Sequence, residues 1–126
     1  MTAAWSAAEL AEFSSQDELF IETRRKDGST VSAVPIWMVV VDEKLYVRTW
    51  EVRTTGWYGR AVRDGTAAVS TGGPKTPVTV EQVGSLDSDA IEAAYRRKYR
   101  RYAASTLDPI LTDDGIATTL RLTPTR

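Results

Sequence analysis

Arginines gather between Leu45 and Arg63, where their type and spacing suit the binding of a phosphate group. This stretch holds four arginines against one acid, Glu51. Thr54-Thr55-Gly56 lies at the start of a predicted short helix, and the first N–H groups and the dipole of a helix attract an anion. A phosphate would therefore fit this stretch of the chain.

The arginines also have an ordinary structural interpretation. Arg48 could pair with Glu51 or Asp64, and Arg60 and Arg63 could be solvated on the surface of the helix, where ion pairs contribute little. A charge-assisted hydrogen bond contributes roughly 1.5–3 kcal/mol, so two arginines and a few amides would give micromolar affinity for a phosphate. The residue types alone leave both interpretations open.

Four aromatic side chains flank the arginines: Trp37, Trp50, Trp57 and Tyr58. Such rings can stack on a planar ligand or line a substrate groove. We assign Trp57 to the ligand ring, and the groove to Trp37, Trp50 and Tyr58. The alternative is packing: Trp37 lies in a β-branched strand and favours burial, while Trp50 and Trp57 could instead seal a subunit interface.

Histidine and cysteine are both absent from the chain. Their absence excludes Ser/His/Asp and Cys/His catalysis, disulfides and thiolate metal sites, and we predict no metal site. Chemistry must then come from carboxylates, lysine, tyrosine or a bound cofactor. The acidic pairs Asp87/Asp89 and Asp113/Asp114 stand where helix caps and turns are expected, so we assign no catalytic residue.

The net charge of −1 gives no overall field that would attract nucleic acid or an anionic membrane. A basic run from Arg96 to Arg101 interleaves with Tyr95, Tyr99 and Tyr102. Helical spacing puts the tyrosines on the apolar stripe that faces the rest of the fold, so we do not expect a nucleic-acid partner. Lys98, on the inward edge, could reach the acidic tail of a ligand across a dimer.

The 126 residues, 42% of them hydrophobic, are enough for one core, and we predict a single domain over 1–126. Ser6 and Glu9 form a capping box at the start of an amphipathic helix. Neither a signal peptide nor an apolar stretch long enough to span a bilayer is evident. We expect a soluble cytoplasmic protein without membrane contact.

Alternation and turn residues predict six strands, at 18–25, 30–41, 45–49, 66–71, 76–83 and 116–122. Three- and four-residue spacing predicts a helix from 87 or 88 to 103, besides the short helix over 56–64 and a turn of helix over 106–113. Six largely antiparallel strands are too few for two full sheets. The pattern predicts a mainly β (α+β) fold, a small closed or split barrel with a long helix against it.

Several short motifs accompany these elements: Pro35-Ile36-Trp37, Tyr46-Val47-Arg48, Gly72-Gly73, Ala94 to Tyr99 and Thr119 to Leu122. Together with the order of strands and helices, they resemble the flavin-binding split-barrel superfamily. That superfamily includes pyridoxamine-phosphate oxidase and the deazaflavin-dependent nitroreductases. The resemblance is closest to an uncharacterised bacterial branch and covers nearly the whole chain.

The resemblance implies a six-stranded antiparallel split β-barrel with two or three flanking helices. It also implies a homodimer that binds FMN or a deazaflavin in a groove at the subunit interface. Its phosphate-holding positions are Arg48, Thr49, Arg53, Thr54, Thr55 and Arg60 in this chain. In the common flavin pattern a serine is followed two positions later by a lysine, and Thr55 and Trp57 stand at these two positions.

The missing lysine leaves four alternatives: FMN, a deazaflavin, another phosphate-bearing ligand or a degenerate pocket. We predict a flavin- or deazaflavin-binding protein, an oxidoreductase that acts on a small molecule. The alternative is a non-catalytic ligand-binding or interaction barrel that has lost the redox cofactor.

Overall fold

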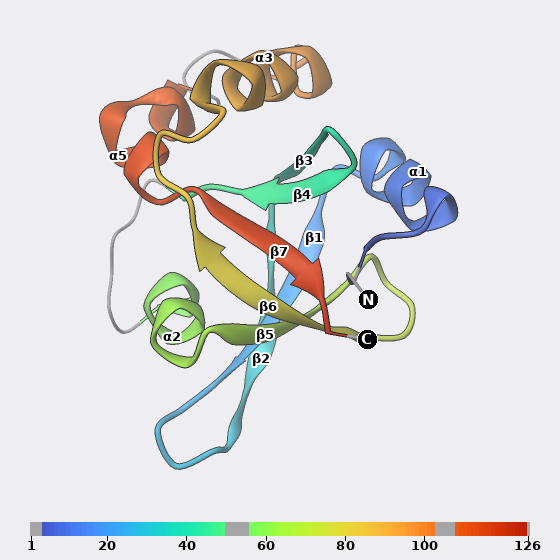
Figure 1. The fold of residues 1–126 in the computed structure, drawn as a ribbon. Helices are drawn as coiled ribbons and strands as arrows, with labels where there is room; N and C mark the ends of the chain where they lie inside the picture. Colours follow the sequence, from blue (N-terminus) through green and yellow to red (C-terminus); the bar gives the residue numbers. More distant parts are fainter. Residues whose placement is uncertain (1–3, 50–55, 103–107, 126) are drawn as a thin grey trace.

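The structure, a computed structural model, describes residues 4–49, 56–102 and 108–125. They form one antiparallel sheet of seven strands that curls into a half-barrel (Figure 1). The order of strands across the sheet is β2-β1-β5-β6-β7-β4-β3. The strands are β1 Leu19–Arg24, β2 Thr30–Ile36, β3 Met38–Val41, β4 Lys44–Val47, β5 Thr66–Ser70, β6 Thr76–Gln82 and β7 Leu120–Pro124.

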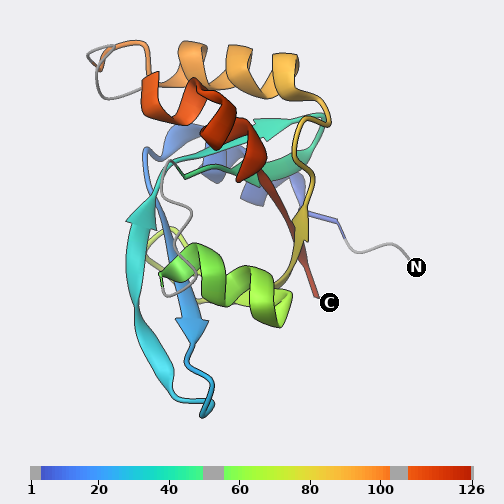
Figure 2. The same cartoon turned by 90° about the vertical axis from the view of Figure 1, so that its left-hand side faces the viewer.

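Helices flank the sheet at several places. They are α1 Ala7–Ser15, α2 Trp57–Asp64, α3 Ser88–Lys98, the 3-10 helix η1 Asp108–Leu111 and α5 Asp113–Ala117. Figures 1 and 2 show α3 and α5 together at one end of the barrel, with α2 on the side near β5. The longest, α3, has 11 residues, and none of the helices in the described ranges is long and apolar enough to cross a bilayer.

The predicted capping box of α1 and the predicted end of α2 at residue 64 are confirmed by the structure. The capping box of α1 is formed, because the Glu9 N–H donates to Ser6 Oγ over 3.1 Å and the Ser6 N–H donates to Glu9 Oε1 over 2.8 Å. Gly65 closes α2 in the left-handed conformation (φ 68°), and its N–H donates to the Ala61 carbonyl over 2.8 Å.

The predicted strand over 30–41 is two strands, because the chain changes its pairing partner at Trp37. Ile36 of β2 lies opposite Leu19 of β1, whereas Met38 of β3 lies opposite Val47 of β4. The sheet therefore has seven strands rather than the predicted six. Since β2 and β3 are the two edges of the sheet, the link at Trp37 joins these edges through the chain and gives a split barrel.

Two other element boundaries differ from the prediction. The long helix ends at Lys98 rather than at 103, because Tyr99 leaves helical geometry (φ −106°, ψ 22°) and its hydroxyl donates to the Asp17 carbonyl over 2.7 Å. The last strand begins at Leu120 rather than at 116, because α5 uses the preceding residues. The predicted helix over 106–113 lies partly outside the described residues, and its described part is η1.

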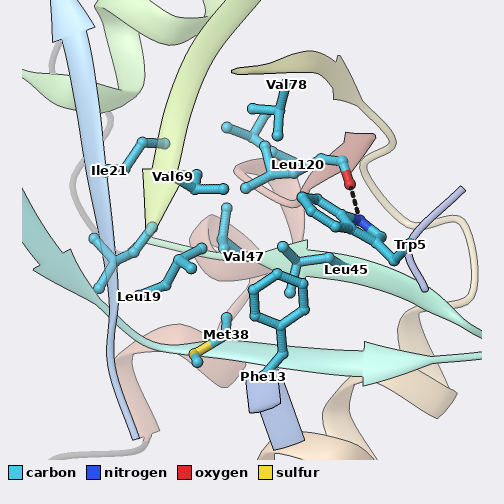
Figure 3. Close-up of a cluster of buried hydrophobic side chains, with 12 residues drawn as sticks. Trp5, Phe13, Leu19, Ile21, Met38, Leu45, Val47, Val69, Val78 and Leu120 are labelled. Carbon is cyan, nitrogen blue, oxygen red and sulfur yellow. Dashed lines mark hydrogen bonds between the residues drawn. The ribbon is translucent and has the colours of Figure 1, made fainter. Parts of the chain in front are cut away.

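The interior of the barrel is an apolar cluster formed by alternate residues of the strands (Figure 3). Leu19 and Ile21 of β1 and Leu120 and Leu122 of β7 are at most 1% exposed. Trp5 covers one side of this core, and its indole N–H donates to the Leu122 carbonyl over 2.9 Å. The alternation that predicted the strands therefore also identified the core.

A second apolar cluster lies between the sheet and α3. Tyr95 of α3 and Tyr99, which follows the end of this helix, are fully buried against Val39 of β3 and Tyr46 of β4. Tyr95 and Tyr99 of the basic run thus face the barrel, as predicted, whereas Tyr102 is exposed. The two buried rings are not available for stacking on nucleic-acid bases.

Candidate functional site

The start of α2 is the part of the described structure that best suits an anion. Gly56 is the N-cap in an extended conformation, and no described side chain caps the helix. The first turn carries no acid. The early N–H groups of a helix have no partner within the helix, so a phosphate there would meet amide donors and the positive end of the dipole.

Arg60 lies one turn further along α2 and points toward β1. Its Nε donates to Thr23 Oγ1 over 2.8 Å, and Thr23 is 3% exposed. A buried acceptor therefore fixes the guanidinium beside the helix. The local sequence pattern did not identify Thr23 as a partner of Arg60.

Trp57 and Tyr58 are half-buried at the flank of the barrel and pack against its interior. Their rings meet edge to face with centroids 6.1 Å apart. The Tyr58 hydroxyl accepts a hydrogen bond from Gln82 Nε2 over 3.2 Å, so β6 holds this ring. The structure thus brings Trp57, Tyr58 and Arg60 together on one helix, and Gln82 is a contact that the sequence did not indicate.

Arg48 is not at the surface, where a direct phosphate contact would require it. It is 3% exposed, and among the described residues it donates to three neutral oxygens of the protein. Its burial lowers the pKa of the guanidinium below its ordinary value. Pairing with Asp64 is also not observed, since Asp64 binds Arg63 over 2.9 Å. Contact with a phosphate, as predicted for Arg48, would therefore require the guanidinium to leave these partners.

Trp37 lies in the second apolar cluster, apart from Trp57 and Tyr58, which pack on the first. Its ring stacks on Tyr99 with centroids 4.0 Å apart and planes inclined by 4°. This is the packing alternative, and the structure does not place Trp37 with the residues of α2. Thr49, the remaining described member of the predicted phosphate site, donates its N–H to Thr118 Oγ1 over 3.1 Å.

Four predicted site residues lie outside the described residues: Trp50, Arg53, Thr54 and Thr55. Beside Thr23 the described chain forms a cavity of about 260 Å³, lined from β1, β5, β6 and the end of α2. This volume lies below the range of roughly 300–1,000 Å³ that encloses drug-sized ligands. Among the described residues, no group of three acidic side chains could hold a metal ion.

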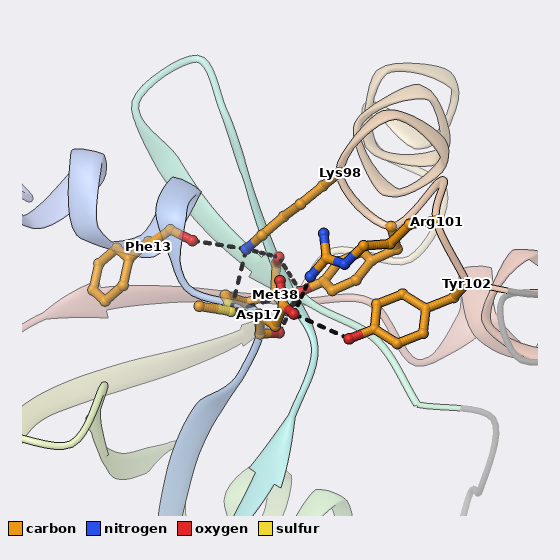
Figure 4. A network of polar contacts seen from close by, with 7 residues as sticks. Phe13, Asp17, Met38, Lys98, Arg101 and Tyr102 are labelled. Atoms are coloured by element: carbon orange, nitrogen blue, oxygen red, sulfur yellow. Dashed lines mark hydrogen bonds and ion pairs between the residues drawn. The ribbon is translucent and has the colours of Figure 1, made fainter.

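Lys98 turns inward and binds its own chain (Figure 4). Its ammonium donates to the Phe13 carbonyl over 2.7 Å and to the Met38 carbonyl over 2.8 Å, and so links α1, α3 and β3. The adjacent Asp17 carboxylate accepts from Arg101 and, over 3.0 Å, from the Tyr102 hydroxyl. Reaching a ligand across a dimer would require Lys98 to break both carbonyl contacts.

Burial lowers the pKa of Lys98 from 10.5 to about 8, against the attraction of Asp17. The unfolded chain then binds more protons than the folded one between these values, so the free energy of unfolding rises with pH across this window. We expect this rise to be lost in Lys98→Met and kept in the control Arg97→Met, whose side chain is exposed. Chemical denaturation between pH 7.5 and 10 tests the prediction, and identical pH dependence in both variants would contradict it.

A curled antiparallel sheet whose edges are joined through Trp37, with these flanking helices, defines a class of proteins. The class is the split barrels that are similar to pyridoxamine-phosphate oxidases and deazaflavin-dependent nitroreductases. Within it, the chain belongs to a family described as an uncharacterized protein conserved in bacteria (DUF2255), which matches residues 9–122. The predicted resemblance to an uncharacterised bacterial branch is thereby confirmed. A search of curated proteins found no match.

Three solved structures illustrate the range of the class. A protein assigned provisionally as a pyridoxamine 5'-phosphate oxidase from Listeria innocua has a TM-score of 0.61 and 13% identity, over 93% of this chain and 90% of that one. An F420 reductase has a TM-score of 0.60 and 15% identity, over 92% of each chain. HutZ, the heme storage protein from Vibrio cholerae, has a TM-score of 0.56 and 14% identity, over 95% of this chain and 90% of that one. At such identities the likeness establishes the fold alone.

Proposed function

We propose that the protein binds a flavin or deazaflavin by its phosphate tail and is an oxidoreductase that acts on a small molecule. The observation that carries the proposal is the start of α2, which has no acid, no described side-chain cap and an anchored arginine one turn away. These residues fit a phosphate, because amide N–H groups, the helix dipole and a guanidinium all favour a negative charge there. When bound, the ring would supply hydride or electron transfer that the protein's own side chains lack.

The role of the protein in this proposal is to hold and orient the cofactor. The amides of Trp57 and Tyr58 donate to the phosphate, Arg60 neutralises its charge, and Thr23 keeps Arg60 in place. The half-buried rings of Trp57 and Tyr58 form part of the wall of the cofactor groove, next to the phosphate. F420 reductase supports this choice as a similar fold named for a deazaflavin. Haem receives less support, because histidine and cysteine, two common ligands of haem iron, are absent.

The proposal includes a homodimer. The cavity of about 260 Å³ is lined by Asp64 at the end of α2, away from the helix start, so in this proposal a second copy supplies the remaining wall of the groove. Light scattering of the purified protein tests this step, with twice the mass of the 13.9 kDa chain as the expected result. A monomer that binds the cofactor would contradict it.

A non-catalytic ligand-binding or interaction barrel is the second candidate, and Trp57 favours it. This residue stands at the lysine position of the flavin pattern and is packed against the core instead of offering a charge. The visible absorbance of the concentrated protein distinguishes the candidates, measured after incubation with FMN or F420 and removal of unbound ligand by gel filtration. We expect the protein to retain the absorbance of the cofactor ring. If no ring absorbance is retained with either compound, the result would contradict the oxidoreductase proposal.

A further inference from the structure

Arg48 joins the end of β4 to three elements that are distant in the sequence. Its Nε donates to Thr119 Oγ1 over 2.8 Å, next to the first residue of β7. One terminal nitrogen donates to the Ile110 carbonyl of η1 over 3.3 Å, and the other lies 3.5 Å from Ser88 Oγ at the start of α3. A single planar group with donors in fixed directions thus contacts α3, η1 and the approach to β7.

The neighbouring residue, Thr49, is held by the same region. Its N–H donates to Thr118 Oγ1 over 3.1 Å, and the Thr118 hydroxyl donates back to the Thr49 carbonyl. Thr118 and Thr119 are fully buried, and their hydroxyls also lie 3.1 and 3.2 Å from the Gly115 carbonyl of α5. We call Arg48, Thr49, Gly115, Thr118 and Thr119 the Arg48 junction.

Burying a guanidinium is costly, and an apolar side chain of similar length would fill the same space without that cost. Here the charge is retained between neutral oxygens and the ring of Tyr95, whose centroid lies 6.0 Å from the guanidinium carbon. What the guanidinium adds over an apolar residue is direction: its donors fix three oxygens relative to the end of β4. This favours a positioning role.

We propose that Arg48 is a positioning residue, which fixes the point where the chain leaves β4 for α2, and that it makes no contact with the phosphate. Six residues separate Thr49 from Gly56, the N-cap of α2. The Arg48 junction therefore fixes the position of Thr49, from which the chain continues to Gly56 at the proposed phosphate site. The effect on the cofactor rests on the proposed function, whereas the effect on Thr49 does not.

The test compares Arg48→Met with Arg60→Met in two measurements. Without cofactor, we expect the Thr49 amide of Arg48→Met to exchange with deuterium at least 10-fold faster than in the unaltered protein, with the amides of β5 unchanged. In binding measurements, we expect Arg48→Met to lower the affinity for FMN and for riboflavin by the same factor, because displacement of the chain at Thr49 affects both compounds. Arg60→Met should lower the affinity for FMN alone, because riboflavin has no phosphate.

Unchanged exchange at Thr49 would overturn the positioning role. Loss of FMN affinity with riboflavin unaffected in Arg48→Met would overturn it too, and would make Arg48 a phosphate contact. If the unaltered protein binds neither a flavin nor F420, the proposed function fails, and the exchange rate of Thr49 alone decides on Arg48. Should Arg48→Met not fold, Arg48→Lys is measured in the same way, with faster Thr49 exchange expected because an ammonium lacks the planar fork.

Discussion

Replacing Arg60 with methionine is expected to weaken FMN binding about 10- to 100-fold and to leave riboflavin binding unchanged. A charge-assisted hydrogen bond to a phosphate contributes roughly 1.5–3 kcal/mol, and each 1.4 kcal/mol is a factor of ten in affinity. Methionine keeps much of the length of the side chain and removes the charge. The change should therefore act on the phosphate and spare the packing of α2 against β1.

Arg63→Met is the matched control for this experiment. It removes the same charge from the same helix, but Arg63 lies in the last turn, where it binds Asp64 over 2.9 Å and the Arg24 carbonyl over 2.7 Å. Its loss should change FMN affinity by less than about threefold, because the field of a surface charge is weak at that distance in water. Fluorescence titration of both variants gives the comparison. Equal affinities for FMN in Arg60→Met and the unaltered protein would show that the phosphate binds elsewhere.

Gly115→Ala is expected to destabilise the fold by about 3 kcal/mol. A methyl group at this position would lie 2.1 Å from the Ile110 carbonyl oxygen and 2.5 Å from its carbonyl carbon. Both are backbone atoms, which cannot rotate away, so α5 and η1 must move apart. Since the Gly115 carbonyl also contacts the hydroxyls of Thr118 and Thr119, the shift should disturb the Arg48 junction as well.

Gly73→Ala is the control, because nothing lies within 4 Å of a methyl group there and its backbone is not left-handed. Its free energy of unfolding should be the same as, or slightly above, that of the unaltered protein, since alanine restricts the unfolded chain. Urea denaturation of both variants provides the measurement. A Gly115→Ala variant as stable as Gly73→Ala would show that α5 does not pack on η1 as described.

Local signals in the sequence predicted much of the fold, because they act between near neighbours. The capping box at Ser6 and Glu9 formed, the short helix ended at residue 64 as predicted, and alternate residues of β1 are buried. Tyr95 and Tyr99 faced the sheet as their spacing indicated. Such patterns need only the geometry of a helix or strand to be interpreted.

The break at Trp37 could not be predicted in this way. The residues on both sides are equally β-branched, so the local pattern is one continuous strand. The change of partner depends on Met38 pairing with Val47 while Ile36 pairs with Leu19. Pairing between distant strands is decided by the whole sheet and leaves no mark at the residue where it changes.

The site was harder to predict than the fold, because charge and spacing do not show the direction of a side chain. Arg48 and Arg60 were equivalent in the sequence, yet one is buried and the other lies on α2. The acceptors of Arg48 include Thr119 and the Ile110 carbonyl, 71 and 62 residues away. An arginine that faces inward can thus be distinguished from one on the surface only when the positions of those distant residues are known.

The most direct test of the proposed phosphate site is an NMR titration of the amide groups of the protein with FMN, repeated with F420. We predict saturable shifts that are largest at Trp57, Tyr58 and Gly59, because these N–H groups lie at the start of α2, where the phosphate is proposed to bind. Riboflavin should leave these amides largely unshifted, since it lacks the phosphate. Saturable shifts confined to other parts of the chain, or no saturable shift with either FMN or F420, would contradict it.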